Sequence, residues 1–120
     1  MTLVLIVEDN EMNRDMLSRR LQRKGLDTAC AIDGPSGIAA AAELQPDIIL
    51  MDVALGEMDG WEATRAIKSD PATAHIPVIA LTAHALESDR KKSIDAGCAE
   101  FETKPVDIAR LLEKIGLCLN

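Results

Sequence analysis

Residues 3–10 of the chain read LVLIVEDN and combine the two features that decide the fold. The first five residues, Leu3–Val7, are branched and apolar, a run too short for a helix or for a membrane span. Glu8, Asp9 and Asn10 follow without a gap. Continuous rather than alternating apolarity predicts a strand that is covered on both faces, as in a parallel sheet. Ligands bind beyond the carboxyl ends of such strands, which makes the three polar residues a candidate site.

Short apolar runs recur along the chain, with helical spacing between them. We expect strands at residues 3–7, 27–31, 47–51, 77–81 and 99–103. We expect helices at residues 12–24, 38–44, 61–67, 86–96 and 106–119, with glycine as the stop signal after the first and fourth. Five strand–helix units in succession predict an α/β fold, a doubly wound five-stranded parallel sheet with five helices.

Length and composition narrow the class of protein. The chain has 120 residues, of which 48% are hydrophobic and 28% charged, enough for the core of one domain. We find no linker and no repeat, so residues 1–120 are expected to form one domain without an attached output domain. The formal charge of −7 and the scattered basic residues argue against direct nucleic-acid binding. No signal peptide or membrane span is predicted.

Cysteine usage favours a reducing, cytoplasmic setting. The three cysteines, Cys30, Cys98 and Cys118, are odd in number and lack zinc-ligand spacing. Cys30 and Cys98 have apolar neighbours in the sequence, and we expect both thiols to be buried.

The residues at the ends of the predicted strands carry the chemistry. Glu8 and Asp9 follow the first strand, Asp52 the third, Thr82 the fourth and Lys104 the fifth. Three carboxylates so close together repel one another, which favours uptake of a cation. A set of oxygen ligands suits Mg²⁺ or Mn²⁺. A carboxylate oxygen left free beside the metal could then attack phosphorus and form an aspartyl phosphate, with Lys104 and Thr82 placed to contact the phosphoryl oxygens.

With these residues in place, the sequence resembles the receiver domain of two-component response regulators. Within that family it is most similar to the single-domain receivers of the DivK type. The resemblance covers essentially the whole chain and rests on five short motifs in order: VEDN at 7–10, MD at 51–52, DG at 59–60, LTA at 81–83 and TKP at 103–105. It implies the flavodoxin-like fold of CheY relatives, with strand order 2-1-3-4-5.

The resemblance also implies roles for single residues. Asp52 would be the phosphoacceptor, served by a histidine kinase or a histidine phosphotransfer protein. Glu8, Asp9, Asp52 and the backbone carbonyl of Ala54 would hold Mg²⁺, and a downstream protein would read the phosphorylated state. The donor would dock beside the first helix, near Asn13, Arg14, Met16 and Leu17.

Further residues match positions of the family that respond to phosphate. Thr82 matches the switch hydroxyl, with Ala83 beside it, and Lys104 the lysine that pairs with phosphate. Phe101 matches the switch aromatic, and Pro105 follows a bond that is usually cis in relatives.

Three positions in the loops beside the site set this chain apart from others of the family. Ala54 and His84 occupy the two variable positions that tune the phosphoryl lifetime in the family. Gly56 stands where many relatives have proline, so we expect a less preorganised loop.

Simpler interpretations of the same residues stay open at this stage. Asp9 or Asn10 could cap the first helix. Asp52 and Thr82 could be ordinary strand-end residues, and Phe101 a plain core aromatic. Both histidines, His75 and His84, are expected at the surface.

Three other functions compete with the phosphorylated switch, which is not itself a classical enzyme. A magnesium phosphohydrolase would usually carry D-x-D after the first strand, where this chain has Glu8-Asp9-Asn10. A flavin carrier would need a phosphate loop and aromatic side chains, and the chain has no Tyr. A degenerate receiver, acting only as a binding module, is at odds with the presence of Asp52, Thr82 and Lys104.

Overall fold

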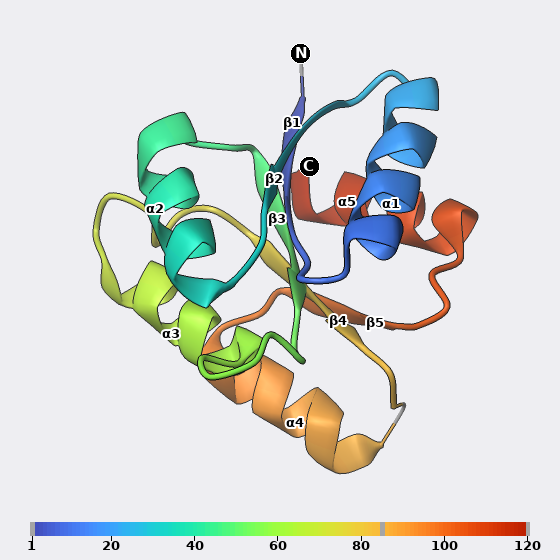
Figure 1. Ribbon diagram of the computed structural model, residues 1–120. Helices are drawn as coiled ribbons and strands as arrows, with labels where there is room; N and C mark the ends of the chain where they lie inside the picture. The colour runs from blue at the N-terminus through green and yellow to red at the C-terminus, as the bar shows by residue number, and fades with distance from the viewer. Residues whose placement is uncertain (1, 85, 120) are drawn as a thin grey trace.

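The computed structural model describes residues 2–84 and 86–119. Its five strands form one parallel sheet in the order β2-β1-β3-β4-β5, so the predicted fold class and strand order are confirmed (Figure 1). The elements follow one another as β1 (Leu3–Val7), α1 (Glu11–Arg23), β2 (Asp27–Ala31), α2 (Gly34–Leu44), β3 (Ile48–Asp52), α3 (Gly60–Ser69), β4 (Val78–Thr82), α4 (Glu87–Ala96), β5 (Glu100–Thr103) and α5 (Ile108–Leu119).

Helices cover both faces of the sheet. Leu17 and Leu21 of α1 pack with Leu111 and Ile115 of α5 on one face. Residues of α2 and α3 pack on the other, where α4 lies against α3 and the edge strand β5. Figure 1 shows α1 and α5 together on the right of the view and the other three helices on the left and below. No helix among the described residues is long and apolar enough to cross a membrane.

The strands β3 and β4 begin and end one residue later than expected. Asp52 is the last residue of β3 and Thr82 the last of β4, where the apolar runs predicted them just beyond. Strands pair through backbone hydrogen bonds, so a polar side chain does not end the pairing. Asp52 pairs in register with Leu81, and Thr82 pairs with Thr103. Both side chains are therefore fixed by strand geometry.

Capping side chains account for the starts of α2 and α5, which differ from the prediction. α2 begins four residues before Ile38 because Asp33 and Ser36 form a reciprocal capping box and Pro35 stands in the first turn. α5 begins at Ile108, two residues later than expected, because the Asp107 carboxylate accepts the N–H of Arg110 (3.0 Å).

One prediction of burial was wrong. Cys98 is buried as expected, but Cys30 is exposed, because β2 is an edge strand that other elements cover only partly. On α1, Leu17 and Leu21 face the core, whereas Met12 is 79% and Met16 45% exposed.

Candidate functional site

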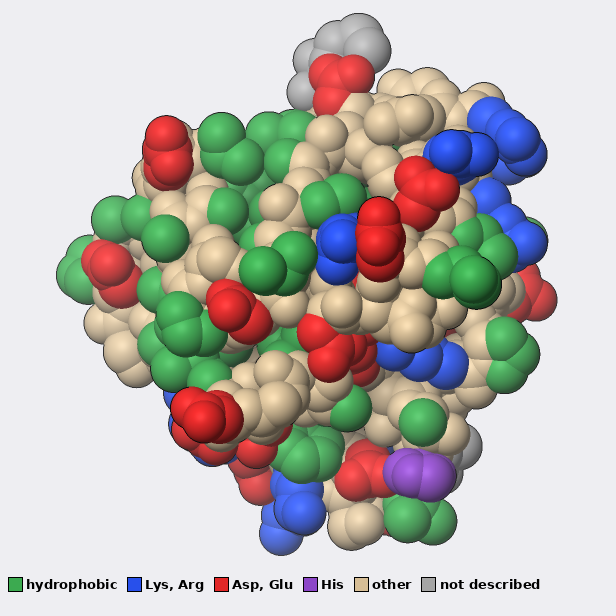
Figure 2. Space-filling view, in the orientation of Figure 1, with side chains coloured by type: hydrophobic (Ala, Val, Ile, Leu, Met, Phe, Trp, Pro, Cys, Tyr) green, Lys and Arg blue, Asp and Glu red, His purple; other side chains and the backbone are tan. Residues whose placement is uncertain are grey.

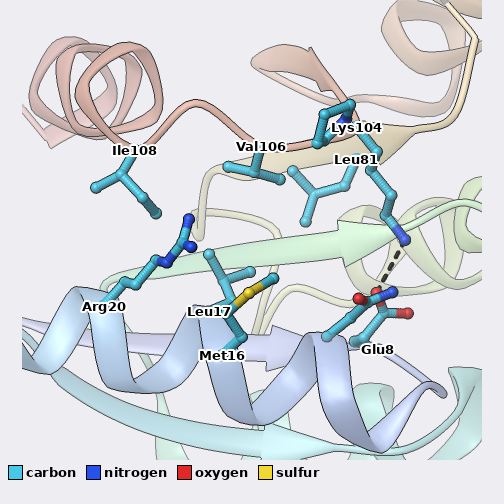
Figure 3. A pocket seen from close by; sticks show the side chains of 10 residues that line it. Glu8, Met16, Leu17, Arg20, Leu81, Lys104, Val106 and Ile108 are labelled. Atoms are coloured by element: carbon cyan, nitrogen blue, oxygen red, sulfur yellow. Dashed lines mark hydrogen bonds and ion pairs between the residues drawn. The ribbon is translucent and has the colours of Figure 1, made fainter.

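Three charged side chains meet at the carboxyl edge of the sheet. Glu8 follows β1, Asp52 ends β3 and Lys104 follows β5. The Lys104 ammonium lies between the two carboxylates, with Nζ 2.8 Å from Glu8 Oε1 and 3.2 Å from Asp52 Oδ2. Figure 3 shows this lysine extending from the end of β5 toward Glu8. The structure thus brings together residues that lie up to 96 positions apart in the sequence.

Asp9 completes an acidic cluster with these two carboxylates. One oxygen of each of Glu8, Asp9 and Asp52 lies within 4.8 Å of the others. Glu8 and Asp52 are buried, whereas Asp9 is exposed, so the cluster opens to solvent on the Asp9 side. Asn10 is the residue that caps α1, its Oδ1 accepting the N–H of Asn13 (2.9 Å), which answers the question of which residue performs that role.

The cluster has too few positive charges and hydrogen-bond donors to satisfy all of its carboxylate oxygens. Burial and the neighbouring Asp52 raise the pKa of Glu8, and Lys104 opposes that shift only in part. Burial lowers the pKa of Lys104, but the two carboxylates outweigh this effect and the net shift is upward. Glu8 Oε2 is the one buried side-chain oxygen among the described residues that has no hydrogen-bond partner. A buried carboxylate oxygen without a partner costs free energy of folding. This oxygen is therefore free to act as a ligand to a cation.

A divalent cation fits this set of residues. The available metal ligands are all carboxylate oxygens and are few in number, and one side of the cluster is open to water. Mg²⁺ prefers such a site. A thiolate or imidazole that would favour zinc is absent from the described cluster.

The Asp52 carboxylate is held from two sides. Its Oδ1 accepts the N–H of Ala54 (3.1 Å), while Oδ2 faces Lys104. α3 begins directly against its backbone, and a Cβ on Gly60 would lie 2.3 Å from the Asp52 carbonyl oxygen. Any side chain at position 60 would push β3 and α3 apart. The DG motif therefore has a steric reason at Gly60 and a capping reason at Asp59, which accepts the N–H of Glu62 (2.8 Å).

The conformation of the loop that follows Asp52 depends on Gly56. This residue has φ of +91°, a conformation that proline cannot adopt and that other L-residues rarely do. Glycine is therefore required here by the loop that this chain forms, rather than only loosening it. Ala54 is exposed at the start of the same loop.

Thr82 and its neighbours lie beside the cluster on the next strand. The Thr82 side chain is buried, and its Oγ1 accepts the N–H of His84 (3.2 Å), so the hydroxyl proton is free for another acceptor. The Thr82 carbonyl accepts the N–H of Lys104 (2.7 Å), which ties β4 to the lysine loop. Ala83 and His84 are exposed.

Phe101 and Pro105 flank this arrangement on β5 and after it. Phe101 is half-buried and packs against the core on the α2–α3 face. Lys114 of α5 lies over the ring, with Nζ 5.6 Å from the centroid. The bond between Lys104 and Pro105 is cis, as the resemblance implied.

An apolar pocket of about 480 Å³ adjoins the cluster between α1 and the segment after β5 (Figure 3). Of the four residues expected beside a donor, Asn13, Met16 and Leu17 line it, together with Val106 and Ile108. The fourth, Arg14, has a role that sequence reasoning missed. Its Nη1 donates to the Glu8 carbonyl (2.9 Å) and so fixes the backbone of the acidic cluster. An arginine six residues after a glutamate gives no signal for such a contact.

Two response regulators are similar to this chain over most of its length. The chain is 39% identical over 112 residues to the response regulator PleD of Caulobacter vibrioides, a match that covers 93% of this chain but 25% of PleD. It is 38% identical over 112 residues to the polar-differentiation response regulator DivK of Brucella anthropi, covering 93% of this chain and 91% of DivK.

A solved structure of a receiver domain is also similar to this chain. The receiver domain of the sensor histidine kinase PA1611 from Pseudomonas aeruginosa, with magnesium coordinated in its active-site cleft, superposes with a TM-score of 0.90. It is 33% identical, and the match covers 98% of this chain and 97% of that one. The family model for the response regulator receiver domain matches residues 4–116. The chain therefore belongs to the response regulator receiver family, whose members are signalling modules rather than classical enzymes.

Proposed function

We propose that this receiver is a phosphorylated switch, in which Asp52 accepts a phosphoryl group from the phosphohistidine of a histidine kinase or phosphotransfer protein. The observation that carries the proposal is the position of Asp52, a buried carboxylate 3.2 Å from a lysine and within 4.8 Å of two further carboxylates. Such a cluster would destabilise a fold that made no use of it, because each close pair of like charges costs about 4 kcal/mol at an effective dielectric near 20.

The transfer itself is a displacement at phosphorus. An oxygen of the Asp52 carboxylate attacks, the new P–O bond forms, the P–N bond to the donor imidazole breaks, and the imidazole leaves with its electron pair and is then protonated by solvent. Lys104, already 3.2 Å from Asp52 Oδ2, neutralises charge on the phosphoryl oxygens. The free hydroxyl proton of Thr82 and the backbone N–H of Ala83 are donors for the same oxygens.

Glu8, Asp9 and Asp52, with the backbone carbonyl of Ala54, are the residues that would hold Mg²⁺. When bound, the ion supplies charge neutralisation for the phosphoryl oxygens and brings the carboxylates together. Glu8 contributes the oxygen that lacks a partner within the protein. Mn²⁺ suits the same ligands.

The phosphorylated state is read through a change of surface. Thr82 moves toward the phosphoryl group, and Phe101 turns into the space that it leaves, which alters the face formed by α4, β5 and α5. A downstream protein recognises that face. Ala54 and His84, both exposed beside the site, set how long the phosphoryl group lasts.

The donor docks over the pocket between α1 and the segment after β5, where Asn13, Met16 and Leu17 lie. The cytoplasm is the compartment that suits this exchange. The match spans 91% of DivK, whereas it covers a quarter of PleD.

Intact-mass spectrometry after incubation with acetyl phosphate tests the assignment of Asp52. With Mg²⁺ present, we expect the chain to gain one phosphoryl mass, and with a metal chelator the gain should be much slower. Asp52→Asn should show none, whereas Asp47→Asn, an exposed carboxylate before the same strand, should react like the native chain. Full labelling of Asp52→Asn would refute the proposal.

A further inference from the structure

The net negative charge of this protein is confined to one continuous segment. Residues 25–64 contain eight acidic side chains and no Lys, Arg or His. The rest of the chain is nearly neutral, with 12 acidic and 13 basic side chains. The segment folds into β2, α2, β3, the loop after β3 and the first turn of α3. Figure 2 shows red and green side chains over α2, with the blue ones mainly over α1 and along the lower edge.

A second pocket lies within this acidic region, on the opposite side of the sheet from α1. It has a volume of about 480 Å³ and lies between the start of α2 and the start of α3. Its lining is half carboxylate and half apolar: Asp33, Pro35, Leu55, Glu57, Met58 and Glu62. Glu57 and Glu62 are exposed at its rim, and Leu55 is buried at its floor.

The walls of this pocket are held in place by local contacts. The capping box between Asp33 and Ser36 fixes the start of α2. Met58 lies against Gly34, where a Cβ would come within 2.7 Å of the methionine sulfur. Hydrogen bonds from Ser36 lower the pKa of Asp33, so this carboxylate keeps its charge.

We propose that this α2–α3 pocket docks a cationic amphipathic segment of a partner protein, in which Lys or Arg side chains flank one or two apolar side chains. The apolar floor accepts the apolar side chain, and the carboxylates of Asp33, Glu57 and Glu62 pair with the flanking cations. No basic side chain lines the pocket to repel such a segment. The occupant is a protein segment rather than a nucleic acid or an anionic membrane, because both of those would be repelled by the rim.

This surface is distinct from the pocket beside α1, and its use does not require phosphorylation of Asp52. Failure of phosphotransfer and failure of this docking are therefore separate results. A small cation would prefer the Glu8–Asp9–Asp52 cluster, so binding has to be measured with that cluster saturated by Mg²⁺.

The test is an NMR titration of the uniformly labelled chain with a short capped peptide of leucine and arginine, the leucines at i, i+4 spacing, in excess Mg²⁺. We expect saturable shifts at the amides of residues 33–37 and 55–62. An arginine-only peptide of equal charge should bind more weakly, and added salt should weaken both.

Matched variants give the test its specificity. Removing two rim charges with Glu57→Gln and Glu62→Gln should weaken binding about fivefold, the effect of two exposed charge pairs. Glu43→Gln, an exposed carboxylate of the same acidic segment outside the pocket, should leave the affinity unchanged. Met58→Ala should remove the preference for the leucine peptide. Equal loss in Glu43→Gln and the double variant, or shifts spread over the whole acidic surface, would overturn the proposal.

Discussion

Glu8 and Glu102 are buried to the same extent, each with a side chain that is 3% exposed, but their surroundings differ. Both oxygens of Glu102 are satisfied: Oε1 accepts the N–H of Thr103 (3.0 Å), and Oε2 pairs with Arg110 and Lys114, each at 3.2 Å. Glu8 has one cation on Oε1 and no partner for Oε2. Glu102 is therefore a fully paired carboxylate that joins β5 to α5, whereas Glu8 is a buried carboxylate with one oxygen left unpaired.

The largest effect should come from breaking the completed network. Glu102→Ala leaves Lys114 and Arg110 without their carboxylate, and we expect it to lower the free energy of unfolding by about 3 kcal/mol, the lower end for a buried pair because Arg110 is half exposed. Denaturant unfolding measures this. The control is Glu113→Ala, which removes an exposed carboxylate on α5, the helix that carries Arg110 and Lys114. A loss in Glu102→Ala no larger than in the control would remove the distinction between the two glutamates.

Magnesium should act on one glutamate and not on the other. At a hundred times its dissociation constant, Mg²⁺ should stabilise the native chain by about 2.7 kcal/mol, because it binds the folded state alone. Glu8→Gln and Asp9→Asn should lose this gain, while Glu102→Gln should keep it. Thermal melts with and without the metal decide the point, and a shift that persists in Asp9→Asn would contradict the assigned ligands.

The pH dependence sharpens the same contrast. The pKa of Glu8 is raised above its ordinary value of 4.5 by burial and by Asp52, so the folded state holds this proton more tightly than the unfolded state. Its contribution to stability is complete below pH 4.5 and is lost as the pH rises through the folded pKa, at no more than about 1.4 kcal/mol per pH unit.

Glu8→Gln cannot ionise at this position, which isolates that contribution. Without metal, the variant should therefore gain stability relative to the native chain as the pH rises from 4.5. Unfolding curves of both proteins across this pH range, in chelator, give the difference directly. Parallel pH profiles would show that Glu8 is not destabilised by its surroundings.

The smallest effect concerns the exposed member of the cluster. In the absence of metal, Asp9→Asn removes one of three neighbouring negative charges, and we expect a gain of about 0.5 kcal/mol because solvent screens most of the repulsion. The same substitution at Asp27, an exposed carboxylate on β2, should change stability less. A loss of stability in Asp9→Asn would mean that this carboxylate supports the fold.

The sequence predicted the strands and the gathering of charge at their ends, because both depend on local patterns. The apolar runs and the polar residues after them were sufficient to place Glu8, Asp52, Thr82 and Lys104 on one edge. Boundaries that depend on side-chain capping, such as the start of α2 at Gly34, were missed. The exposure of Cys30 was missed because its burial was predicted from apolar neighbours in the sequence, although the strand order implied by the resemblance puts this strand at the sheet edge.

The difference between Glu8 and Glu102 could not be predicted from the sequence. Glu8 follows a short strand and Glu102 lies within one, and the partners that distinguish them come from distant positions or from another element. The same holds for Gly60, whose close approach to the Asp52 backbone is a property of how α3 packs. Local pattern located the site, and tertiary packing decides which of its groups are left unsatisfied.

Anomalous diffraction from crystals soaked in Mn²⁺ tests the central claim most directly, since the ion can be located without assuming its ligands. We predict one strong peak bounded by Glu8, Asp9 and Asp52, with Glu8 Oε2 among the coordinating atoms and Lys104 still beside Asp52. A cluster that holds no ion at saturating Mn²⁺, or a peak beside Glu102 instead, would contradict the account.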